Sequence, residues 1–117
     1  MAAADSSPLT SSEDAKLLVL ARATRARTGA PAGAALRDRD GRTYAAAAVD
    51  LPSLRLSAVG GCVAMAVSSG STGAEAVVVL ADELDRNDLD IVRDFAGPGV
   101  PVHLASVAGT VTSTSLT

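Results

Sequence analysis

Few side chains in this 117-residue sequence have the chemistry of an active site. The chain has one histidine, His103, and one cysteine, Cys62, so neither an intrachain disulfide nor a His/Cys zinc cluster is available. Ser57 and Ser106 have no activating base beside them, and the spacing suggests no Ser–His–Asp triad. We therefore expect His103 to be a hydrogen-bonded or exposed strand residue and Cys62 to be a small buried apolar side chain.

Two aspartates, Asp85 and Asp88, stand three residues apart in a polar stretch before an apolar-periodic segment. Carboxylates without a third or fourth ligand favour hard cations and bind them weakly. The simpler interpretation is a polar loop in which Asp88 caps the following helix. Residues 68–73 are rich in serine and glycine but lack the lysine of a phosphate-binding loop, so we interpret them as a connection.

The composition disfavours several classes of function. The net charge is −3, from 10 basic and 13 acidic residues, which gives no attraction for a phosphate backbone. Tyr44 and Phe95 are the only aromatic residues, so base stacking has little to build on, and we expect no nucleic-acid partner. No apolar run approaches the ~20 residues of a membrane-spanning helix, so we expect no membrane partner.

The length predicts a single domain over residues 1–117. Residues 1–12 and the last few residues are expected to fray. The N-terminal segment has no basic stretch followed by an apolar one, so it does not resemble a secretory signal. Together with the single cysteine, this predicts a cytoplasmic protein.

Helix signals stand near the start of the chain. Ser11 is a suitable N-cap, and acidic residues follow it where the helix dipole favours negative charge. The helix is predicted to run to Arg27 and to end at Gly29. The turn Asp38-Arg39-Asp40-Gly41 then joins strands predicted at residues 32–36 and 42–49.

The rest of the chain alternates helices with strands. Residues 57–68 are apolar on every side, which is typical of a buried helix. Residues 74–81 are rich in valine and predict a strand buried on both faces. A helix is predicted at residues 88–95, a strand at 100–105 and an edge strand at 107–113. This order predicts an α/β fold, a three-layer α/β/α sandwich around a mixed sheet of about five strands.

Four short motifs follow one another in a characteristic order. The motifs are Gly33-Ala34-Ala35-Leu36, Asp40-Gly41-Arg42-Thr43-Tyr44, Ala48-Val49-Asp50 and Ala66-Val67-Ser68-Ser69-Gly70. In order and spacing they resemble the hairpin and the buried helix of the free-nucleoside cytidine deaminase family. The resemblance covers Glu13 to about Gly109 and implies a cytidine-deaminase-like fold.

The resemblance also implies a zinc site that this sequence does not complete. The family holds zinc through Cys-Ala-Glu or His-Ala-Glu on one helix and Pro-Cys-x-x-Cys at the start of another, and the glutamate moves the proton. Aligned on the end of the buried helix, the first ligand and the glutamate become Ser57 and Val59. Aligned on the hairpin, they become Val59 and Gly61. The two cysteines become Asp85 and Asp88, so we expect no catalytic residue, no metal ligand and no cofactor.

The ribose contacts of the family map onto Ala48 and Asp50. Asp50 keeps a carboxylate and is the candidate nucleoside-binding residue, whereas Ala48 keeps no polar group. The alternative is that Asp50 is a solvated residue at the end of a strand.

Three functional hypotheses follow from the resemblance. The first is a non-catalytic cytidine-deaminase-like protein that acts through binding or assembly. Because family members assemble as dimers or tetramers, this hypothesis includes a homo-oligomer. The second is an active zinc-dependent nucleoside (cytidine) deaminase with displaced ligands, and only this hypothesis requires zinc. The third is a nucleoside or nucleotide sensor that uses Asp50.

Overall fold

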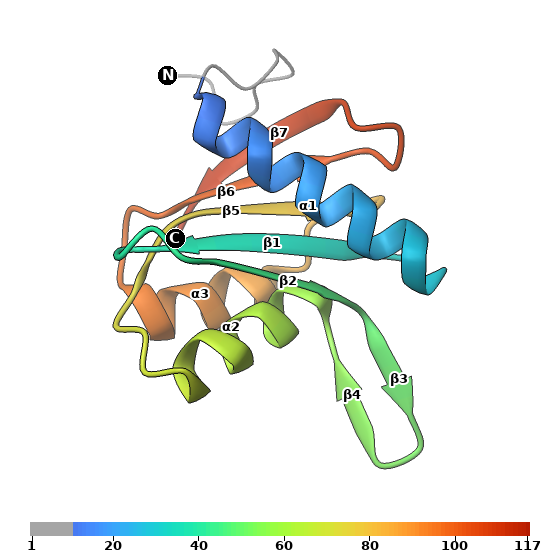
Figure 1. The fold of residues 1–117 in the computed structure, drawn as a ribbon, viewed down its shortest axis with the longest axis horizontal. Helices are drawn as coiled ribbons and strands as arrows, with labels where there is room; N and C mark the ends of the chain where they lie inside the picture. Colours follow the sequence, from blue (N-terminus) through green and yellow to red (C-terminus); the bar gives the residue numbers. More distant parts are fainter. Residues whose placement is uncertain (1–10) are drawn as a thin grey trace.

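The structure is a computed structural model of the chain, and it describes residues 11–117 (Figure 1). Of the segment expected to fray, residues 1–10 lie outside the described residues, while Ser11 and Ser12 begin the first helix. The elements are α1 (Ser12–Thr28), β1 (Gly33–Asp38), β2 (Thr43–Ala47), β3 (Val49–Leu51), β4 (Leu54–Leu56), α2 (Ala58–Ser68), β5 (Ala74–Leu80), α3 (Arg86–Ala96), β6 (Pro101–Ala105) and β7 (Val111–Leu116).

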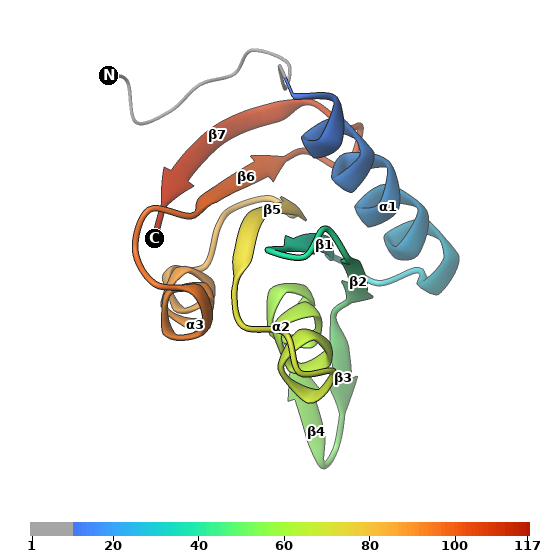
Figure 2. The same cartoon turned by 60° about the vertical axis from the view of Figure 1, so that its left-hand side comes forward.

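The main sheet has five strands in the order β2-β1-β5-β6-β7. Strands β5 and β6 are parallel, and the other three neighbouring pairs are antiparallel. Helix α1 covers one face of the sheet, and α2 and α3 cover the other (Figures 1 and 2). This arrangement confirms the predicted α/β fold with a mixed five-stranded sheet. None of the helices described for residues 11–117 is long and apolar enough to cross a membrane.

The central strand β5 divides the core into two parts. Val77 and Val79 pack with α2 and α3, whereas Val78 and Leu80 pack beneath α1. Alternate residues of a strand point to opposite faces, so one run of valines supplies both sides. The prediction of a strand buried on both faces is therefore confirmed.

Helix α1 begins and ends as predicted. Ser11 Oγ accepts a hydrogen bond from the Asp14 amide, and Gly29 ends the helix at a φ of 69°. Such a left-handed conformation costs glycine little, because it has no Cβ. Asp14 also connects the helix to the sheet. Its carboxylate lies 2.9 Å from the Arg37 guanidinium on β1 and 3.1 Å from His103 Nε2 on β6.

His103 lies under α1, on the face of β6 opposite Val102. Its Nδ1 is 2.8 Å from the Thr114 hydroxyl on β7, and only 8% of the residue is exposed. The interpretation of this lone histidine as a hydrogen-bonded strand residue is confirmed. It links three elements at one point: α1, β6 and β7.

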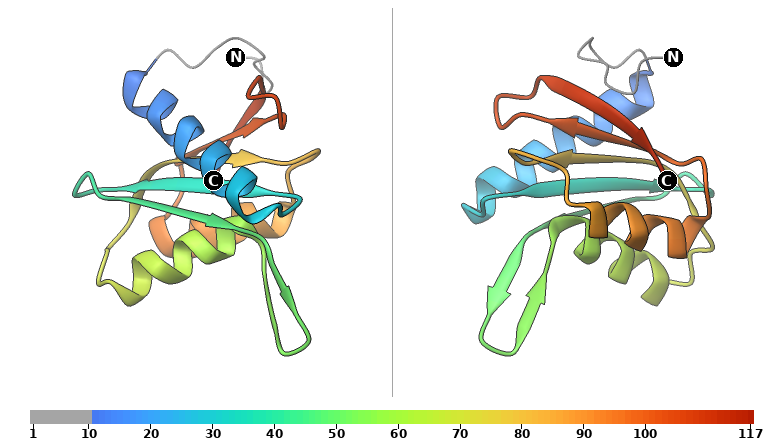
Figure 3. Two further views of the ribbon diagram at one scale, coloured as in Figure 1. Left: turned by 45° about the vertical axis from the view of Figure 1, so that its right-hand side comes forward. Right: turned by 180° about the vertical axis from the view of Figure 1, so that it is seen from behind.

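The structure corrects four expectations. The strand expected at residues 42–49 ends at Ala47, and residues 49–56 form the β3–β4 hairpin, which projects from the body (Figure 3). The last strand is Val111–Leu116 and not residues 107–113, because residues 106–110 form the turn before it. The far end of the chain is not frayed, since Thr117 makes four hydrogen bonds with Gly97, Gly99 and Val100.

The fourth correction concerns α2, which is not buried on every side. One side of the helix packs in the core through Val59, Cys62 and Ala66. The other side is exposed, with Met65 at 38% and Val67 at 55%. Helix α2 is therefore apolar on every side but buried on only one.

The β1–β2 turn is organised by Asp38, a carboxylate with no exposed surface. It accepts hydrogen bonds of 2.9 Å from the Asp40 and Arg42 amides and one of 3.1 Å from the Tyr44 hydroxyl. Burial alone would raise the pKa of Asp38, but these bonds and one from Ser71 outweigh it and lower the pKa below its ordinary value. The turn therefore depends on an ionised carboxylate.

Replacing Asp38 by asparagine should reduce the free energy of unfolding by about 2 kcal/mol, because an amide cannot accept all of these bonds. The folded-state pKa is below the unfolded value of about 4, so this stability is present above pH 4 and is lost as pH falls through the folded pKa. Denaturation at several pH values measures both effects. Asp40→Asn, on the same turn but exposed, is the control and should change little.

Candidate functional site

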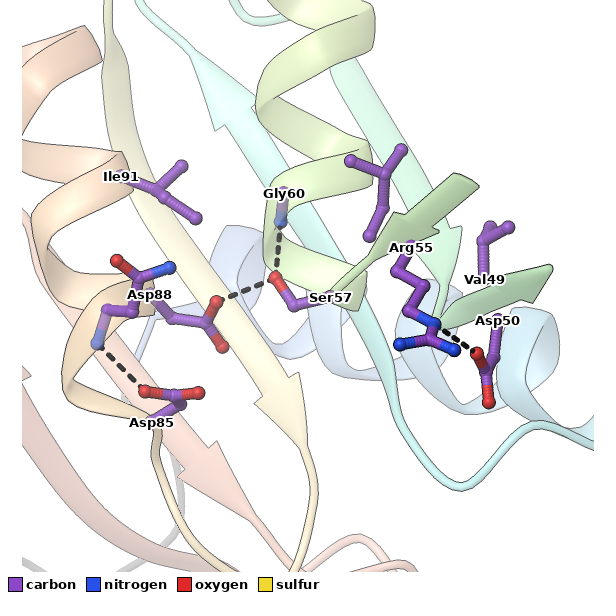
Figure 4. A pocket seen from close by; sticks show the side chains of 10 residues that line it. Val49, Asp50, Arg55, Ser57, Gly60, Asp85, Asp88 and Ile91 are labelled. Atoms are coloured by element: carbon purple, nitrogen blue, oxygen red, sulfur yellow. Dashed lines mark hydrogen bonds and ion pairs between the residues drawn. The ribbon is translucent and has the colours of Figure 1, made fainter. Parts of the chain in front are cut away.

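Two helix starts meet at the candidate site. Ser57 is the N-cap of α2, and Asp88 lies in the first turn of α3. The Ser57 hydroxyl donates a hydrogen bond of 2.6 Å to Asp88 Oδ1 and accepts one of 2.9 Å from the Gly60 amide (Figure 4). Ser57 thus caps its own helix and ties it to the neighbouring one.

The cap of α3 is Asp85, whose carboxylate accepts a hydrogen bond of 2.9 Å from the Asn87 amide. This corrects the expectation that Asp88 caps the helix. Asp88 instead turns toward α2. The group that the Ser57 hydroxyl contacts is a carboxylate from α3, 31 residues away in the sequence, and no histidine stands between them.

A cavity of about 720 Å³ opens beside this hydrogen bond. The β3–β4 hairpin forms one wall and the starts of α2 and α3 form the other (Figure 4). Its lining residues are Val49, Asp50, Arg55, Leu56, Ser57, Gly60, Asp85, Asn87, Asp88 and Ile91. The volume is in the range of small-molecule sites.

Asp50 lies in the hairpin wall of this pocket. Its carboxylate pairs with Arg55 across the hairpin at 3.1 Å, and both side chains are largely exposed. The structure therefore brings Asp50 to the same pocket as Ser57 and Asp88, and its role in nucleoside binding stays a prediction. Arg55 and Asn87 were not predicted as site residues, because a hairpin at residues 49–56 was not predicted and the start of α3 was placed two residues too late.

Burial raises the pKa of the Asp88 carboxyl, the hydrogen bond from Ser57 lowers it in part, and the neighbouring Asp85 raises it. Asp88 contacts the Ser57 hydroxyl directly, without the histidine that carries the proton in a Ser–His–Asp triad. The pair therefore joins α2 to α3 and does not form a triad.

Val59 and Gly61, the other positions of the two alignments, are buried, and so is Cys62, which falls on neither ligand position. Val59 and Cys62 have no exposed surface, and Gly61 is in contact range of Ala46. The Cys62 thiol lies 3.6 Å from the Tyr44 carbonyl, and burial raises its pKa to about 12. Cys62 is thus a protonated, buried side chain directed away from the pocket, as expected.

The donors at the pocket do not fit the zinc ion that the resemblance implies. Zinc in deaminase-type sites takes cysteine and histidine ligands, whereas a hydroxyl and two carboxylates meet here. Ser57 and Asp88 also satisfy each other. Among residues 11–117, no three histidine, cysteine, aspartate or glutamate side chains group in a way that would hold a metal.

Replacing Ser57 by alanine should lower the free energy of unfolding by about 1–2 kcal/mol, because both the helix cap and the link to α3 are lost. Ser57→Thr keeps the hydroxyl and is the control. In an Asp88→Ala background the same replacement should cost less, since the partner is already gone. Denaturation of the four variants measures the coupling, and equal costs in both backgrounds would contradict a link between the helices.

Comparisons with known proteins agree with this fold. A model of the family described as cytidine deaminase-like matches residues 10–109. No curated protein matches the chain.

Solved structures similar to this chain include three bacterial cytidine deaminases. The Burkholderia pseudomallei protein is 20% identical, with a TM-score of 0.73 over 88% of this chain and 90% of that one. The Mycobacterium leprae protein is 21% identical, with a TM-score of 0.67 over 84% of this chain and 91% of that one. The Mycobacterium tuberculosis protein is 20% identical, with a TM-score of 0.68 over 79% of this chain and 85% of that one. These likenesses show a shared fold, and the family match over residues 10–109 shows that the chain belongs to the cytidine deaminase-like family.

Proposed function

We propose that this family member does not deaminate nucleosides and acts through binding or assembly. The observation that carries the proposal is the Ser57–Asp88 hydrogen bond, which joins the two helix starts where the family resemblance expects zinc ligands. In the same alignment the catalytic glutamate is replaced by Val59, which has no exposed surface. The positions that this alignment assigns to the first zinc ligand and to the proton carrier thus hold a serine and a valine.

The convergence of three side chains supports the alignment on the end of the buried helix, which assigns the first ligand to Ser57, over the alignment on the hairpin. Ser57, Asp85 and Asp88 all line one pocket, as ligands of a single ion would. The alternative alignment places the ligand at the buried Val59 and the glutamate at Gly61. A Cβ at Gly61 would lie only 2.9 Å from Ala46 Cβ, so a larger side chain has no room there.

The exposed side of α2 supports assembly with a second copy of this chain. The helix has no charged residue, and Met65 and Val67 are exposed on it. The neighbouring hairpin exposes Leu51 and Leu54 at 55% and 48%. Cores of protein interfaces are depleted of charge, and the uncharged exposed side of α2 is complementary to itself about a two-fold axis, with the Asp50–Arg55 ion pair of the hairpin at its rim. We therefore place the assembly surface on α2 and the β3–β4 hairpin.

The pocket itself supports the second candidate, a nucleoside or nucleotide sensor. It combines apolar residues with hydrogen-bonding groups, including Asp50 and Asn87, as small-molecule sites do. Binding in this pocket requires neither zinc nor a proton carrier. The two candidates are compatible, because ligand binding and assembly would use adjacent surfaces.

The purified protein is expected to contain no stoichiometric zinc and to release no uridine from cytidine. Metal analysis with a deaminase assay tests both expectations, and bound zinc with turnover would instead support the active-deaminase hypothesis. A rise in melting temperature with cytidine, lost in Asp50→Ala, would support the sensor, since a ligand that binds only the folded state stabilises it.

A ligand-building variant tests the position of the site. Ser57→Cys with Asp85→Cys and Asp88→Cys should bind Co²⁺ with thiolate absorption bands, because the three positions converge on one pocket. The control variant carries Ser57→Cys, Asp85→Cys and Asp90→Cys, with the last substitution at an exposed position, and it should bind Co²⁺ weakly. Equal binding by both variants would contradict the alignment.

Met65→Glu or Val67→Glu should reduce the assembled mass, because each places charge in the α2 surface. Val107→Glu, at a 42% exposed position in the β6–β7 turn, is the control and should leave the mass unchanged. Light scattering over a range of concentrations measures the mass. A wild-type protein that keeps its 11.6 kDa chain mass at high concentration would contradict assembly.

A further inference from the structure

The charges that line the cavity beside Ser57 are mainly negative. Asp50, Asp85 and Asp88 contribute carboxylates to its lining, and Arg55 contributes the one positive charge. Arg55 lies 3.1 Å from Asp50 on the hairpin wall, so this pair is neutral as a whole. On the opposite wall, Asp85 and Asp88 form no ion pair with any side chain of residues 11–117. The pocket therefore has an excess of negative charge at the start of α3.

Asp88 presents a free oxygen to this pocket although the residue is buried. Only 6% of Asp88 is exposed, and its Oδ1 accepts the hydrogen bond from Ser57. The second oxygen, Oδ2, points away from Ser57 and has no hydrogen-bond partner in the described part of the chain, and protein atoms do not enclose it (Figure 4). An ionised carboxylate accepts several hydrogen bonds. Oδ2 is thus an acceptor that a ligand inside the pocket can reach.

Asp85 adds a second negative charge beside Asp88. Its carboxylate accepts the hydrogen bond of the Asn87 amide and borders the same pocket. Its charge also raises the pKa of the Asp88 carboxyl, so the two carboxylates are within electrostatic reach of each other. The starts of α2 and α3 contribute about half a positive charge each, which offsets the two full charges only in part. A cation between the carboxylates would relieve their repulsion.

The rest of the lining is suited to an organic cation and not to a metal ion. Val49, Leu56 and Ile91 give the pocket an apolar side, which a bare or hydrated ion would not use. Two carboxylates and a hydroxyl offer few ligands to a hard cation, which takes six or more oxygens. An ammonium or guanidinium group needs only hydrogen-bond acceptors, and the carbon skeleton attached to it can contact the aliphatic side chains.

We propose that the pocket binds a small organic cation, an apolar group that carries a primary amine or a guanidinium. The charged nitrogen lies between Asp85 and Asp88, and the apolar part lies against Leu56 and Ile91. The proposal rests on the ligand pocket of the sensor hypothesis and specifies the charge of the ligand. The phosphate of a nucleotide would meet the same carboxylates as a like charge, which costs affinity.

Three probes with one ring and three charges test the proposal: benzylamine, benzyl alcohol and benzoate. In a titration followed by amide NMR, benzylamine should shift the signals of Gly60 and Asn87, which line the pocket, at millimolar concentration. Benzyl alcohol should bind at least about fivefold more weakly, and benzoate should cause no shift. Binding of benzylamine should weaken as NaCl is added, because salt screens accessible charges. Equal binding of the amine and the alcohol would overturn the proposal.

Two variants test the position of the charged nitrogen. Asp85→Asn and Asp88→Asn each remove one charge and keep an oxygen for the α3 cap or for the bond from Ser57. Each should weaken benzylamine binding about tenfold, because a hydrogen bond to a charged group is lost. Asp90→Asn makes the same change at an exposed position of α3 outside the pocket and should have no effect. Thermal unfolding confirms that the variants are folded.

Two results with these variants and probes would contradict the proposal. The first is unchanged benzylamine affinity in both Asp85→Asn and Asp88→Asn. The second is displacement of benzylamine by millimolar Mg²⁺ but not by NaCl of the same ionic strength, which would assign the carboxylates to a metal ion.

A cytidine titration separates this proposal from the sensor hypothesis. Cytidine is neutral, and its expected contact is Asp50 on the hairpin wall. Benzylamine binding without cytidine binding would contradict the sensor and support the organic-cation site. Cytidine binding without a preference for the amine among the three probes would support the sensor and overturn the organic-cation site.

Discussion

The burial of β5 from both sides is the constraint on which the rest of this structure depends. Val77 and Val79 need cover from α2 and α3, and Val78 needs cover from α1, so a helical layer must lie on each face. Neighbouring β1 and β6 complete the hydrogen bonds of the strand. Because the backbone in this centre has no access to water, its polar groups depend on these neighbouring strands for partners.

This packing brings the starts of α2 and α3 together, and the side chains there determine what the site can do. A metal between two helix starts would both hold the helices and supply chemistry. Ser57 and Asp88 join the helices with a hydrogen bond of 2.6 Å. The family fold is thus compatible with a site that connects elements and leaves a pocket beside them.

The same architecture leaves apolar surface on both sides of the sheet. Helix α2 exposes Met65 and Val67, and α1 exposes Val19 beside the open edge of β2. These exposed aliphatic side chains lie outside the core, which the buried residues on the two faces of the sheet form.

The sequence by itself determined the helix caps at Ser11 and Gly29, the β1–β2 turn and the buried β5, because turn chemistry and apolar periodicity act over a few residues. The family resemblance also identified Ser57, Asp85 and Asp88 as the positions to inspect, through alignment of its motifs. Only the tertiary structure decided that Ser57 bonds to Asp88, that α2 is exposed on one side and that residues 49–56 form a hairpin. These outcomes depend on which elements lie next to one another in space, and a pattern of neighbouring residues in the chain does not contain that information.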